Sequence, residues 1–384
     1  MIRRYSKKEI YKISKLLEKS SLLSGYTNNY LGGEEIQKFE TEFAKFHGCK
    51  YGISVNSGTS ALFVAQKAAG IKKSKKVGVP CITFTATTSQ VLACDAIPIF
   101  SDIDKNTYCM DFNFQKSVDF VIPVHLLGYP IKYDKIKQLK EKDIFVIEDC
   151  AQATGAKSGN KMVGSMGDCG IFSFQETKHL TTLGEGGMIV TNNEEFTEKC
   201  RRIRNHGEYY KDGKEVGYNF RMTEIQAAFG RMQLKRLPKI LESFKNNASY
   251  IFKNLPSFIV APSLPKNSKH AFFILGCKYD QKQVNFSREL FLEQLTIKRR
   301  KILGDNLSDI KGVNASPGKI IGSGYRVVQY DIPLYKKFTP KKSCIVGESF
   351  VKESLFLDIH RWRSRSEIKY ELELIRDVSK KLSK

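Results

Sequence analysis

The chain has 384 residues, of which 41% are hydrophobic and 27% charged, a composition that is ordinary for a folded globular protein and argues against disorder. Its formal net charge of +23 makes a polyanionic partner worth considering. The lysines are, however, scattered along the whole chain and accompany no aromatic and basic stripe. We therefore expect a solvated basic surface and no nucleic-acid binding.

The cysteines and the N-terminal segment indicate where the protein works. Nine cysteines form no CxxC pair and no metal-ligand spacing, so we expect reduced, mostly buried thiols and no metal. The opening MIRRYSKKEIYKISKLLEKS lacks the apolar core of a signal peptide. No stretch approaches the ~20 apolar residues of a membrane span. We expect a cytoplasmic protein that does not bind membranes.

Helical and strand patterns alternate between about residues 34 and 235. Residues 34–48 and 59–70 have apolar residues at helical spacing, and each run ends at a glycine. Short β-rich runs bounded by turn residues are YGISV at 51, KVGVP at 76, AIPIFSDI at 96, FVIPVHL at 120, IFVIEDC at 144, CGIFSF at 169 and GGMIVT at 186. Strands separated by helices predict an α/β fold with a mostly parallel sheet that has helices on both faces.

The C-terminal third has a looser pattern. The spacing of Thr223 and Gln226 predicts a capping box that opens a helix, and Pro238 is expected to end that helix. Four apolar residues are expected on one face of it: Ile225, Ala228, Phe229 and Met232. Beyond residue 240 we expect a long amphipathic helix, short strands and a terminal helix. We predict a large domain over residues 1–240, with an N-terminal helical segment, and a small domain over residues 241–384.

Two polar features follow strands whose carboxyl ends should share one edge of the sheet, where ligands bind in open α/β folds. Residues 56–60, NSGTS, lead into a helix, so that hydroxyls and helix N–H groups can cradle a phosphate. Taken alone, a serine at this place is more often only an N-cap. Asp149 ends another strand, where it either caps a turn or faces a cationic ring nitrogen.

A third feature is Lys178, five residues after the strand end at Ser173. A lysine is a useful nucleophile only when its amine can lose a proton, and a single lysine in a loop is nearly always solvated. The three features together are the parts that hold pyridoxal 5'-phosphate, because its phosphate needs donors, its ring nitrogen an anion and its aldehyde an amine. The combination predicts a site for this cofactor.

An ordered series of motifs resembles the DegT/StrS group of nucleotide-sugar aminotransferases, which are pyridoxal-phosphate enzymes of fold type I, the aspartate-aminotransferase-like fold. The series runs from LGGEEIQKFETEF at 31 to GYNFRMTEIQAAFGRMQLKRL at 217, and includes NSGTSAL, PCITFTATTSQVL, VIPVHLLGYP, IEDCAQATGA, GEGGMIVT and RNHGE. The resemblance implies a large domain whose mostly parallel central sheet is sandwiched by helices, and a smaller C-terminal α/β domain.

The resemblance also implies a role for each residue that matches a family motif. Lys178 would form the internal aldimine and shuttle the proton, and Asp149 would pair with the pyridinium nitrogen. The further cofactor-binding residues implied are Ser57, Gly58, Thr59 and Ser173 at the phosphate, Phe84 on the ring face, Gln152 near the phenolic oxygen, and Asn219 at the phosphate of the neighbouring subunit's cofactor. A homodimer with shared active sites follows. Without the resemblance, Phe84 would be assigned to the core and Gln152 to a turn.

The activity implied is ping-pong transamination from L-glutamate to a keto-deoxy nucleotide sugar, in amino-sugar and surface-glycan biosynthesis. Some relatives have histidine in place of the lysine and are pyridoxal-phosphate-dependent sugar dehydratases. Here the count from Ser173 places Lys178, and not His179, at that position. A non-catalytic nucleotide-binding protein on the same fold is the other alternative. The sequence does not specify the sugar, the carbon or the nucleotide.

The chain departs from the family pattern at two positions. Asp95 stands where the family usually has glycine, and Asp358 where it usually has proline. These departures leave the cofactor residues unchanged and concern the substrate pocket, to which C-terminal loops commonly contribute. Residues that either contact substrate or are structural are His125, His206, Tyr325, Arg326 and His360.

Overall fold

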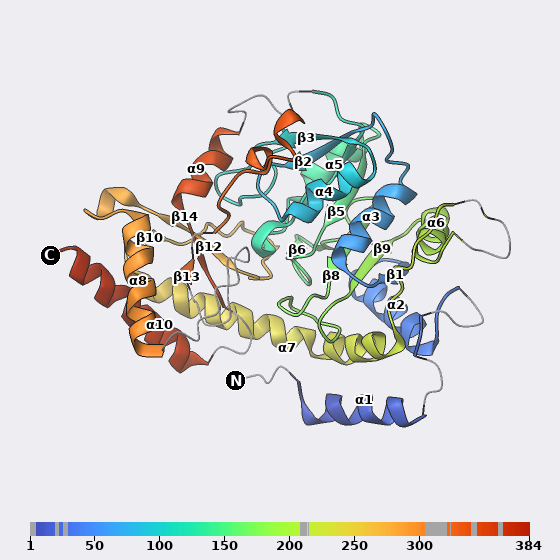
Figure 1. Ribbon diagram of the computed structural model, residues 1–384, viewed down its shortest axis with the longest axis horizontal. Helices are drawn as coiled ribbons and strands as arrows, with labels where there is room; N and C mark the ends of the chain where they lie inside the picture. Colours follow the sequence, from blue (N-terminus) through green and yellow to red (C-terminus); the bar gives the residue numbers. More distant parts are fainter. Residues whose placement is uncertain are drawn as a thin grey trace.

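The computed structural model describes residues 5–19, 23–25, 30–114, 116–207, 213, 215–303, 321–322, 324–338, 344–359 and 364–384. Two main sheets lie side by side, and the long helix α7 (Glu224–Asn254) passes along both of them (Figure 1). The first sheet carries the polar strand ends that the sequence singled out.

The first sheet has seven strands in the order β1-β9-β8-β5-β4-β2-β3. Their bounds are β1 Tyr51–Val55, β2 Lys76–Pro80, β3 Ile97–Ser101, β4 Phe120–Val121, β5 Phe145–Asp149, β8 Cys169–Ser173 and β9 Gly187–Thr191. Only β9 runs antiparallel to its neighbours, β1 and β8, while the other pairs are parallel. The prediction of a mostly parallel sheet is confirmed. Every residue of β8 and β9 is buried, as expected for a sheet covered on both faces.

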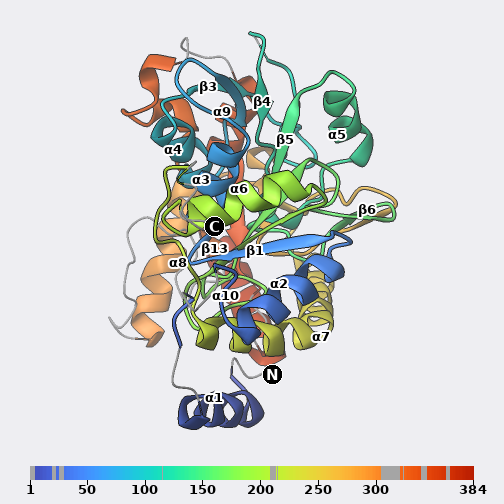
Figure 2. The same ribbon diagram turned by 90° about the vertical axis from the view of Figure 1, so that its right-hand side faces the viewer.

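The helices of this part are α2 (Glu34–Phe46), α3 (Gly58–Ala68), α4 (Thr85–Ala93), α5 (Tyr133–Lys140) and α6 (Glu194–Arg204), with the short 3₁₀ turn η1 (Leu126–Gly128). Helix α3 packs against β8 and β9 and lies between α4 and α6. Helix α2 contacts β1 and lies beside α7 (Figure 2). The turn from α4 to β3 contains Asp95 at φ 58, the left-handed region in which glycine is common and aspartate is tolerated.

Helix α7 differs from its prediction in two respects. The capping box of Thr223 and Gln226 is present, but the helix continues through Pro238 for 31 residues in all. Proline inside a helix costs about 3 kcal/mol, and here buried apolar residues on both sides of it outweigh that cost: Leu234, Leu237, Ile240, Leu241 and Phe244.

The four apolar residues expected on one face of this helix are not all buried. Phe229 is 2% exposed, but Ile225, Ala228 and Met232 are only partly buried, whereas Ala227 and Gly230 are buried. A Cβ atom at Gly230 would lie 2.6 Å from Cζ of Phe39, so α2 and α7 approach each other where one of them has no side chain. This close approach, which no local pattern indicates, decides the orientation of the helix.

The second sheet is antiparallel, in the order β10-β12-β14-β13. Its strands are β10 Ile259–Val260, β12 Leu275–Tyr279, β13 Ile321–Gly322 and β14 Ser354–Leu357, and its helices are α8 Arg288–Leu303, α9 Ile345–Glu353 and α10 Arg365–Leu382, with 3₁₀ turns η2 Gln281–Gln283, η3 Gln329–Asp331 and η4 Lys336–Phe338. A separate hydrophobic cluster joins this sheet to α8, α10 and the second half of α7. The sequence pattern did not predict α8 and α9, and a division of the chain at residue 240 stays our proposal.

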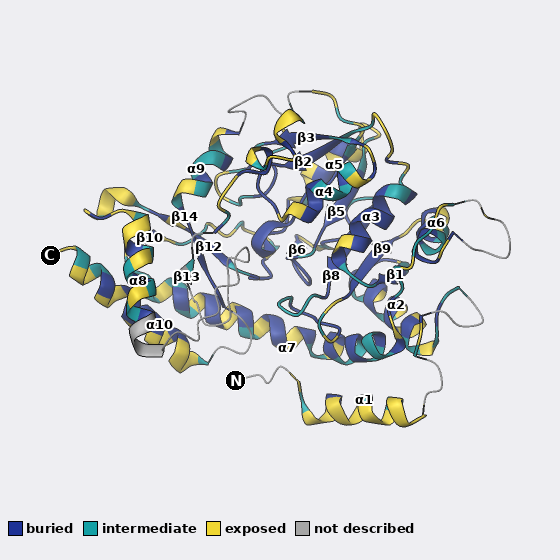
Figure 3. Ribbon diagram, in the orientation of Figure 1, coloured by how far each residue is buried: buried dark blue, intermediate teal, exposed yellow. Residues whose placement is uncertain are grey.

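A third, small sheet, in the order β11-β6-β7, connects the two parts: β6 is Lys157–Ser158, β7 Lys161–Met162 and β11 Ser268–Lys269. Helix α1 (Lys7–Lys19) lies outside both main sheets and is almost wholly exposed (Figure 3). Its buried Glu9 accepts a hydrogen bond of 2.5 Å from Gln233 of α7. All nine cysteines are free and buried, as predicted. In the described part of the chain no helix is both long and apolar enough to cross a membrane.

Candidate active site

Lys178 lies in the loop that connects β8 to β9. The two arms of this loop are paired by hydrogen bonds of 2.8 Å from Phe174 N–H to Gly186 O and from Glu176 N–H to Gly184 O. The Lys178 side chain is partly buried, and its Nζ lies 4.4 Å from the centroid of the Phe273 ring. Burial lowers the pKa of Lys178 to about 8, although Asp149 and Glu185 act to raise it. An amine with this pKa is available in its neutral form near neutral pH.

Asp149 is the last residue of β5, which lies directly beside β8 in the sheet. Its side chain is 4% exposed. Oδ2 accepts a hydrogen bond of 2.9 Å from the Thr87 hydroxyl, and Oδ1 accepts one of 3.1 Å from Ala151 N–H. Burial raises the pKa of Asp149, and these hydrogen bonds together with Lys178 act to lower it. The charge of such a buried carboxylate is costly unless a cation faces it.

The turn before α3 and the end of β8 come into contact because two glycines lie there. A Cβ at Gly58 would lie 2.7 Å from Cβ of Ser173, and one at Gly187 would lie 2.4 Å from Ser57 O. Ser57 is the N-cap of α3 and accepts a hydrogen bond of 3.0 Å from Ser60 N–H, as the simpler interpretation expects. Thr59 is exposed in the first turn. The structure thus brings Ser57, Gly58 and Thr59 together with Ser173, and their role at a phosphate stays a prediction.

Phe84 is not a core residue. Its side chain is 57% exposed, at the N-cap of α4. The same helix carries Thr87, which donates to Asp149, so Phe84 lies one helical turn from a direct partner of this carboxylate. The assignment of Phe84 to the core is therefore wrong, and stacking on a cofactor ring stays a prediction.

Gln152 joins two parts of the chain. Its Oε1 accepts a hydrogen bond of 2.7 Å from Leu127 N–H, and its Nε2 donates one of 3.1 Å to the Tyr325 hydroxyl. Burial raises the pKa of Tyr325 to about 12. Gln152 therefore braces a buried turn, as the simpler interpretation expects. Its amide nitrogen has two N–H groups, so the hydrogen bond to Tyr325 leaves one for another acceptor.

Asn219 is exposed and pairs with Asn205 in an isolated bridge. The next residue, Phe220, donates its N–H to Arg204 O at 3.0 Å and accepts a hydrogen bond of 2.8 Å from Asn56 N–H. Asn219 therefore lies beside the phosphate-cradle candidate of its own chain. This position at the surface is compatible with a contact to a second subunit, which stays a prediction.

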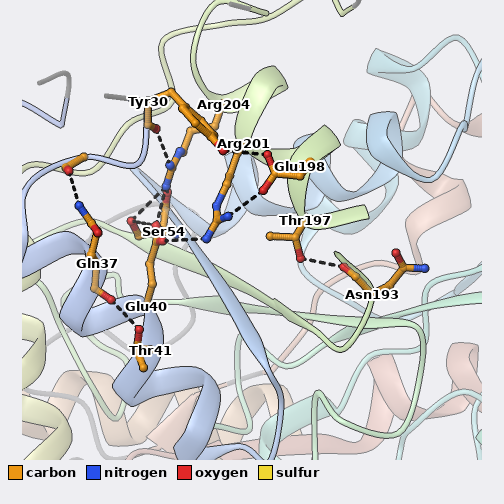
Figure 4. A network of polar contacts seen from close by, with 11 residues as sticks. Tyr30, Gln37, Glu40, Thr41, Ser54, Asn193, Thr197, Glu198, Arg201 and Arg204 are labelled. Atoms are coloured by element: carbon orange, nitrogen blue, oxygen red, sulfur yellow. Dashed lines mark hydrogen bonds and ion pairs between the residues drawn. The ribbon is translucent and has the colours of Figure 1, made fainter. Parts of the chain in front are cut away.

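A buried ion pair lies beside the strand that leads into the phosphate-cradle candidate (Figure 4). Arg204 and Glu40 are each 3% exposed, and Arg204 donates to Oε1 of Glu40 at 2.6 Å and to Ser54 O at 3.0 Å. Arg204 also donates to Tyr30 O at 3.2 Å. Because Arg204 ends α6, Glu40 belongs to α2 and Ser54 to β1, the network attaches two helices to β1, the strand that leads into the cradle.

The remaining candidates divide into structural and exposed residues. His125 is buried with its Nε2 2.8 Å from Oε2 of Glu148, and its Nδ1 accepts from Ile131 N–H, so it is structural. His179 is buried with its Nε2 3.0 Å from Ala271 O. His206 and Arg326 are exposed. His360 lies outside the described residues.

The sequence interpretation missed three contacts of the site. Thr87 was not identified, although the hydroxyl-rich start of α4, TFTATT, was the available signal. Gln329 and Tyr335 were not identified either, because they lie more than 240 residues from their partners near Phe84. No short-range pattern connects such distant residues.

Comparisons with known proteins agree with this geometry. The model of the DegT/DnrJ/EryC1/StrS aminotransferase family matches residues 19–304. The spore coat polysaccharide biosynthesis protein SpsC of Bacillus subtilis is 33% identical over 311 residues, which are 75% of this chain and 77% of that protein. The GDP-perosamine synthase of Escherichia coli O157:H7 is 35% identical over 255 residues, 64% of this chain and 69% of that enzyme. A solved structure of an aminotransferase from Psychrobacter cryohalolentis superposes with a TM-score of 0.86 at 29% identity and covers 99% of this chain and 98% of its own.

The fold and the site thus define an aminotransferase of fold type I. The chain belongs to the DegT/DnrJ/EryC1/StrS aminotransferase family. The cofactor of this family is pyridoxal 5'-phosphate, and the residues present fit it. A buried carboxylate whose pKa is raised gains from a cationic ring nitrogen, an amine with a pKa of about 8 can react with an aldehyde, and the start of α3 offers hydroxyl and N–H donors.

Proposed function

We propose that this aminotransferase moves an amino group from L-glutamate to a keto-deoxy nucleotide sugar in amino-sugar and surface-glycan biosynthesis. The observation that carries the proposal is the electrostatic interaction between Lys178, whose pKa is lowered to about 8, and the buried carboxylate of Asp149. Lys178 lies in the loop that follows β8, and Asp149 ends the adjacent strand β5. Relatives that are named for spore coat polysaccharide biosynthesis and for GDP-perosamine synthesis support the substrate class.

The chain's own residues have separate tasks in this proposal. When bound, the cofactor supplies an electron sink for the substrate carbon that loses its proton. Lys178 Nζ would hold the cofactor's aldehyde and would move the proton to and from the reacting carbon. The negative charge of Asp149 keeps the ring nitrogen protonated, and Thr87 holds this carboxylate in place. Ser57, Gly58, Thr59 and Ser173 bind the phosphate, and Gln152 directs an N–H group to the phenolic oxygen.

The proposal extends to the assembly and its location. Asn219 of one subunit reaches the phosphate of its neighbour's cofactor, so that the active unit is a homodimer with two composite sites and a two-fold axis. Both amino-group acceptor and donor are small molecules, and amino acids and nucleotide sugars are met in the cytoplasm. We therefore infer a cytoplasmic enzyme in which the two half-reactions alternate at one site, the ping-pong order.

The first experiment tests the attachment site. The purified protein is incubated with pyridoxal 5'-phosphate, reduced with borohydride and digested. We expect one modified peptide, which carries the added mass at Lys178. Lys178→Ala should lose this mass, whereas Lys50→Ala, which changes an exposed lysine far along the chain, should keep it. Modification spread over surface lysines in the wild-type protein would contradict the proposal and favour a non-catalytic nucleotide-binding protein.

The second experiment tests the reaction. The loaded enzyme is incubated with glutamate and a panel of 3-keto and 4-keto nucleotide sugars, and 2-oxoglutarate and the aminated sugar are measured together. Formation of 2-oxoglutarate and aminated sugar in equal amounts supports the proposal. Parallel lines in double-reciprocal plots of the initial rate against glutamate at several sugar concentrations support the ping-pong order. Loss of water from the sugar without 2-oxoglutarate would favour the dehydratase.

A further inference from the structure

One C-terminal segment, residues 324–338, contacts the residues around Phe84 and Gln152 from outside the first sheet. It contains η3 and η4 and follows β13 of the second sheet. Tyr325 at its start accepts the hydrogen bond from Gln152. The same segment therefore contacts Gln152, which the proposed function places on the cofactor, and the residues on both sides of Phe84.

Gln329 binds the chain on the N-terminal side of Phe84. It is 3% exposed, and its Nε2 donates to Thr83 O at 2.8 Å. Its backbone N–H donates to Cys81 O, also at 2.8 Å. These two hydrogen bonds attach the loop that follows β2 to the C-terminal segment. The attached residues lie immediately before Phe84.

Tyr335 binds the chain on the other side of Phe84. It is 1% exposed, and its hydroxyl lies 2.7 Å from Oγ1 of Thr85. Because both groups are hydroxyls, either can donate. Gln329 and Tyr335 thus hold the residue before and the residue after Phe84, one through a backbone carbonyl and the other through a side chain.

The side chain of Phe84 is fixed neither by burial nor by a capping hydrogen bond. Its ring is 57% exposed, so core packing does not hold it. It is the N-cap residue of α4, and its side chain makes no capping hydrogen bond. Gln329 and Tyr335 do not cap the helix, but they hold the backbone before Phe84 and the side chain after it.

We propose that Gln329 and Tyr335 are positioning residues that hold Phe84 in the orientation needed to stack on the cofactor ring. This inference rests on the proposed function, because the stacking partner is the cofactor. Stacked aromatic pairs depend on ring offset and angle, so a backbone that moves around Phe84 weakens the contact. The hydroxyls of Thr83 and Thr87 lie 2.9 Å apart, and Thr87 donates to Asp149, also at 2.9 Å. The hydrogen bonds around Phe84 therefore continue to this carboxylate.

The test compares Tyr335→Phe with a matched control, Tyr330→Phe. Tyr330 is also buried, but its hydroxyl donates to Oε1 of Glu348 at 2.8 Å rather than to a residue beside Phe84. Hydrogen exchange of the peptide over residues 82–88 is measured in the protein before cofactor is added, and the dissociation constant of pyridoxal 5'-phosphate is measured after it. We expect Tyr335→Phe to speed exchange of this peptide and to weaken cofactor binding roughly 3- to 10-fold, the effect of one lost hydrogen bond.

A double-mutant cycle locates the effect. Thr85→Val should reproduce most of the effect of Tyr335→Phe, and the double variant should be no worse than Tyr335→Phe, because both remove the hydrogen bond between the two hydroxyls. The longer hydrogen bond of 3.5 Å from the Tyr335 hydroxyl to Thr85 O is lost only in Tyr335→Phe. Additive losses, or exchange and affinity in Tyr335→Phe equal to those of the control, would overturn the inference while the proposed function stands. A wild-type protein that takes up no cofactor would overturn both.

Discussion

Thr87 of α4 donates its hydroxyl hydrogen to Oδ2 of Asp149 at the end of β5, at 2.9 Å. This hydrogen bond joins a helix start to a strand end across the candidate site. It stabilises the charged form of a carboxylate that burial would otherwise protonate more readily. The ionisation of Asp149 therefore depends on a residue 62 positions away in the sequence.

Replacing Thr87 by valine should change how activity falls at low pH. In the proposed function Asp149 is ionised to balance the ring nitrogen, and loss of a donor to its charged form should raise the pKa of Asp149. The acid limb of kcat/KM should therefore shift to higher pH in Thr87→Val. Thr88→Val is the matched control, because the buried Thr88 hydroxyl, on the same helix, has no hydrogen-bond partner. Equal profiles for the two variants would show that Thr87 does not act on Asp149.

The amine of Lys178 should react with the cofactor at a lower pH than the amine of an ordinary, solvated lysine. Burial lowers the pKa of Lys178 to about 8 from 10.5, so the rate at which cofactor-free protein takes up pyridoxal 5'-phosphate should rise with pH through about 8. Glu185 opposes this shift, and Glu185→Gln should therefore lower the midpoint further. Stopped-flow absorbance measures both rates. A midpoint near 10.5 would contradict the burial of this amine.

The same shift has a consequence for stability. The pKa of Lys178 is lower in the folded protein than in the unfolded chain, so between about pH 8 and 10.5 the unfolded chain binds more protons at this residue. The cofactor-free protein should then gain stability from Lys178 as pH rises through this window. Lys178→Met should remove that gain, which urea unfolding at several pH values would detect.

Hybrid dimers test whether Asn219 acts on the neighbouring subunit. Asn219→Ala alone should weaken cofactor retention without unfolding, since its side chain is exposed. In a hybrid of a Lys178→Ala subunit and an Asn219→Ala subunit, a shared arrangement leaves one site with both residues intact. We therefore expect about half of the wild-type activity from separately tagged and co-purified hybrids. If Asn219 acts within its own chain, neither site is intact and the hybrid should have no more activity than Asn219→Ala.

Particular residues show what the sequence could predict. The strand ends at Asp149 and Ser173 and the capping box at Thr223 were predicted correctly, because each depends on a pattern of a few neighbouring residues. The helix through Pro238 was not, since its stability comes from buried residues that pack on distant elements.

The partners of the site residues were equally beyond prediction. Phe84 lies between Gln329 and Tyr335 only because the C-terminal segment folds back over α4. No hydrophobic periodicity or motif spacing in the sequence indicates such a contact. The match to the family ends at residue 304, before this segment. Local motifs therefore sufficed to name the proposed cofactor residues, whereas the contacts of Gln329 and Tyr335 with the chain around Phe84 could only come from the structure.

Removing the charge of Glu40 should be far more costly than removing that of Glu198. Glu40 neutralises Arg204, and both are 3% exposed, so Glu40→Gln leaves a buried guanidinium without its counter-charge. We expect a loss of about 3 to 5 kcal/mol in the free energy of unfolding. Glu198 pairs with Arg201 at 2.8 Å but is 27% exposed, and Glu198→Gln should cost about 1 kcal/mol or less. Urea unfolding checks both, and equal losses would contradict the difference in burial.

Buried His47 should make the protein sensitive to mild acid. Its ring lies 4.4 Å from that of Phe43 and 4.3 Å from that of Phe172, and burial lowers the pKa of His47 to about 3 from 6.5. Between these pH values the unfolded chain binds one more proton at this residue, so its contribution to stability is lost as pH falls from 6.5 towards 3. His47→Phe removes the proton site.

The slope of the unfolding free energy against pH should then decrease in this window by up to about 1.4 kcal/mol per pH unit, the value for one proton. His206→Asn is the control, because His206 is exposed and asparagine tolerates its left-handed backbone at φ 61. Urea unfolding series at several pH values measure the slopes. The same slope in wild type and His47→Phe would mean that His47 is protonated, and therefore hydrated, in the folded protein.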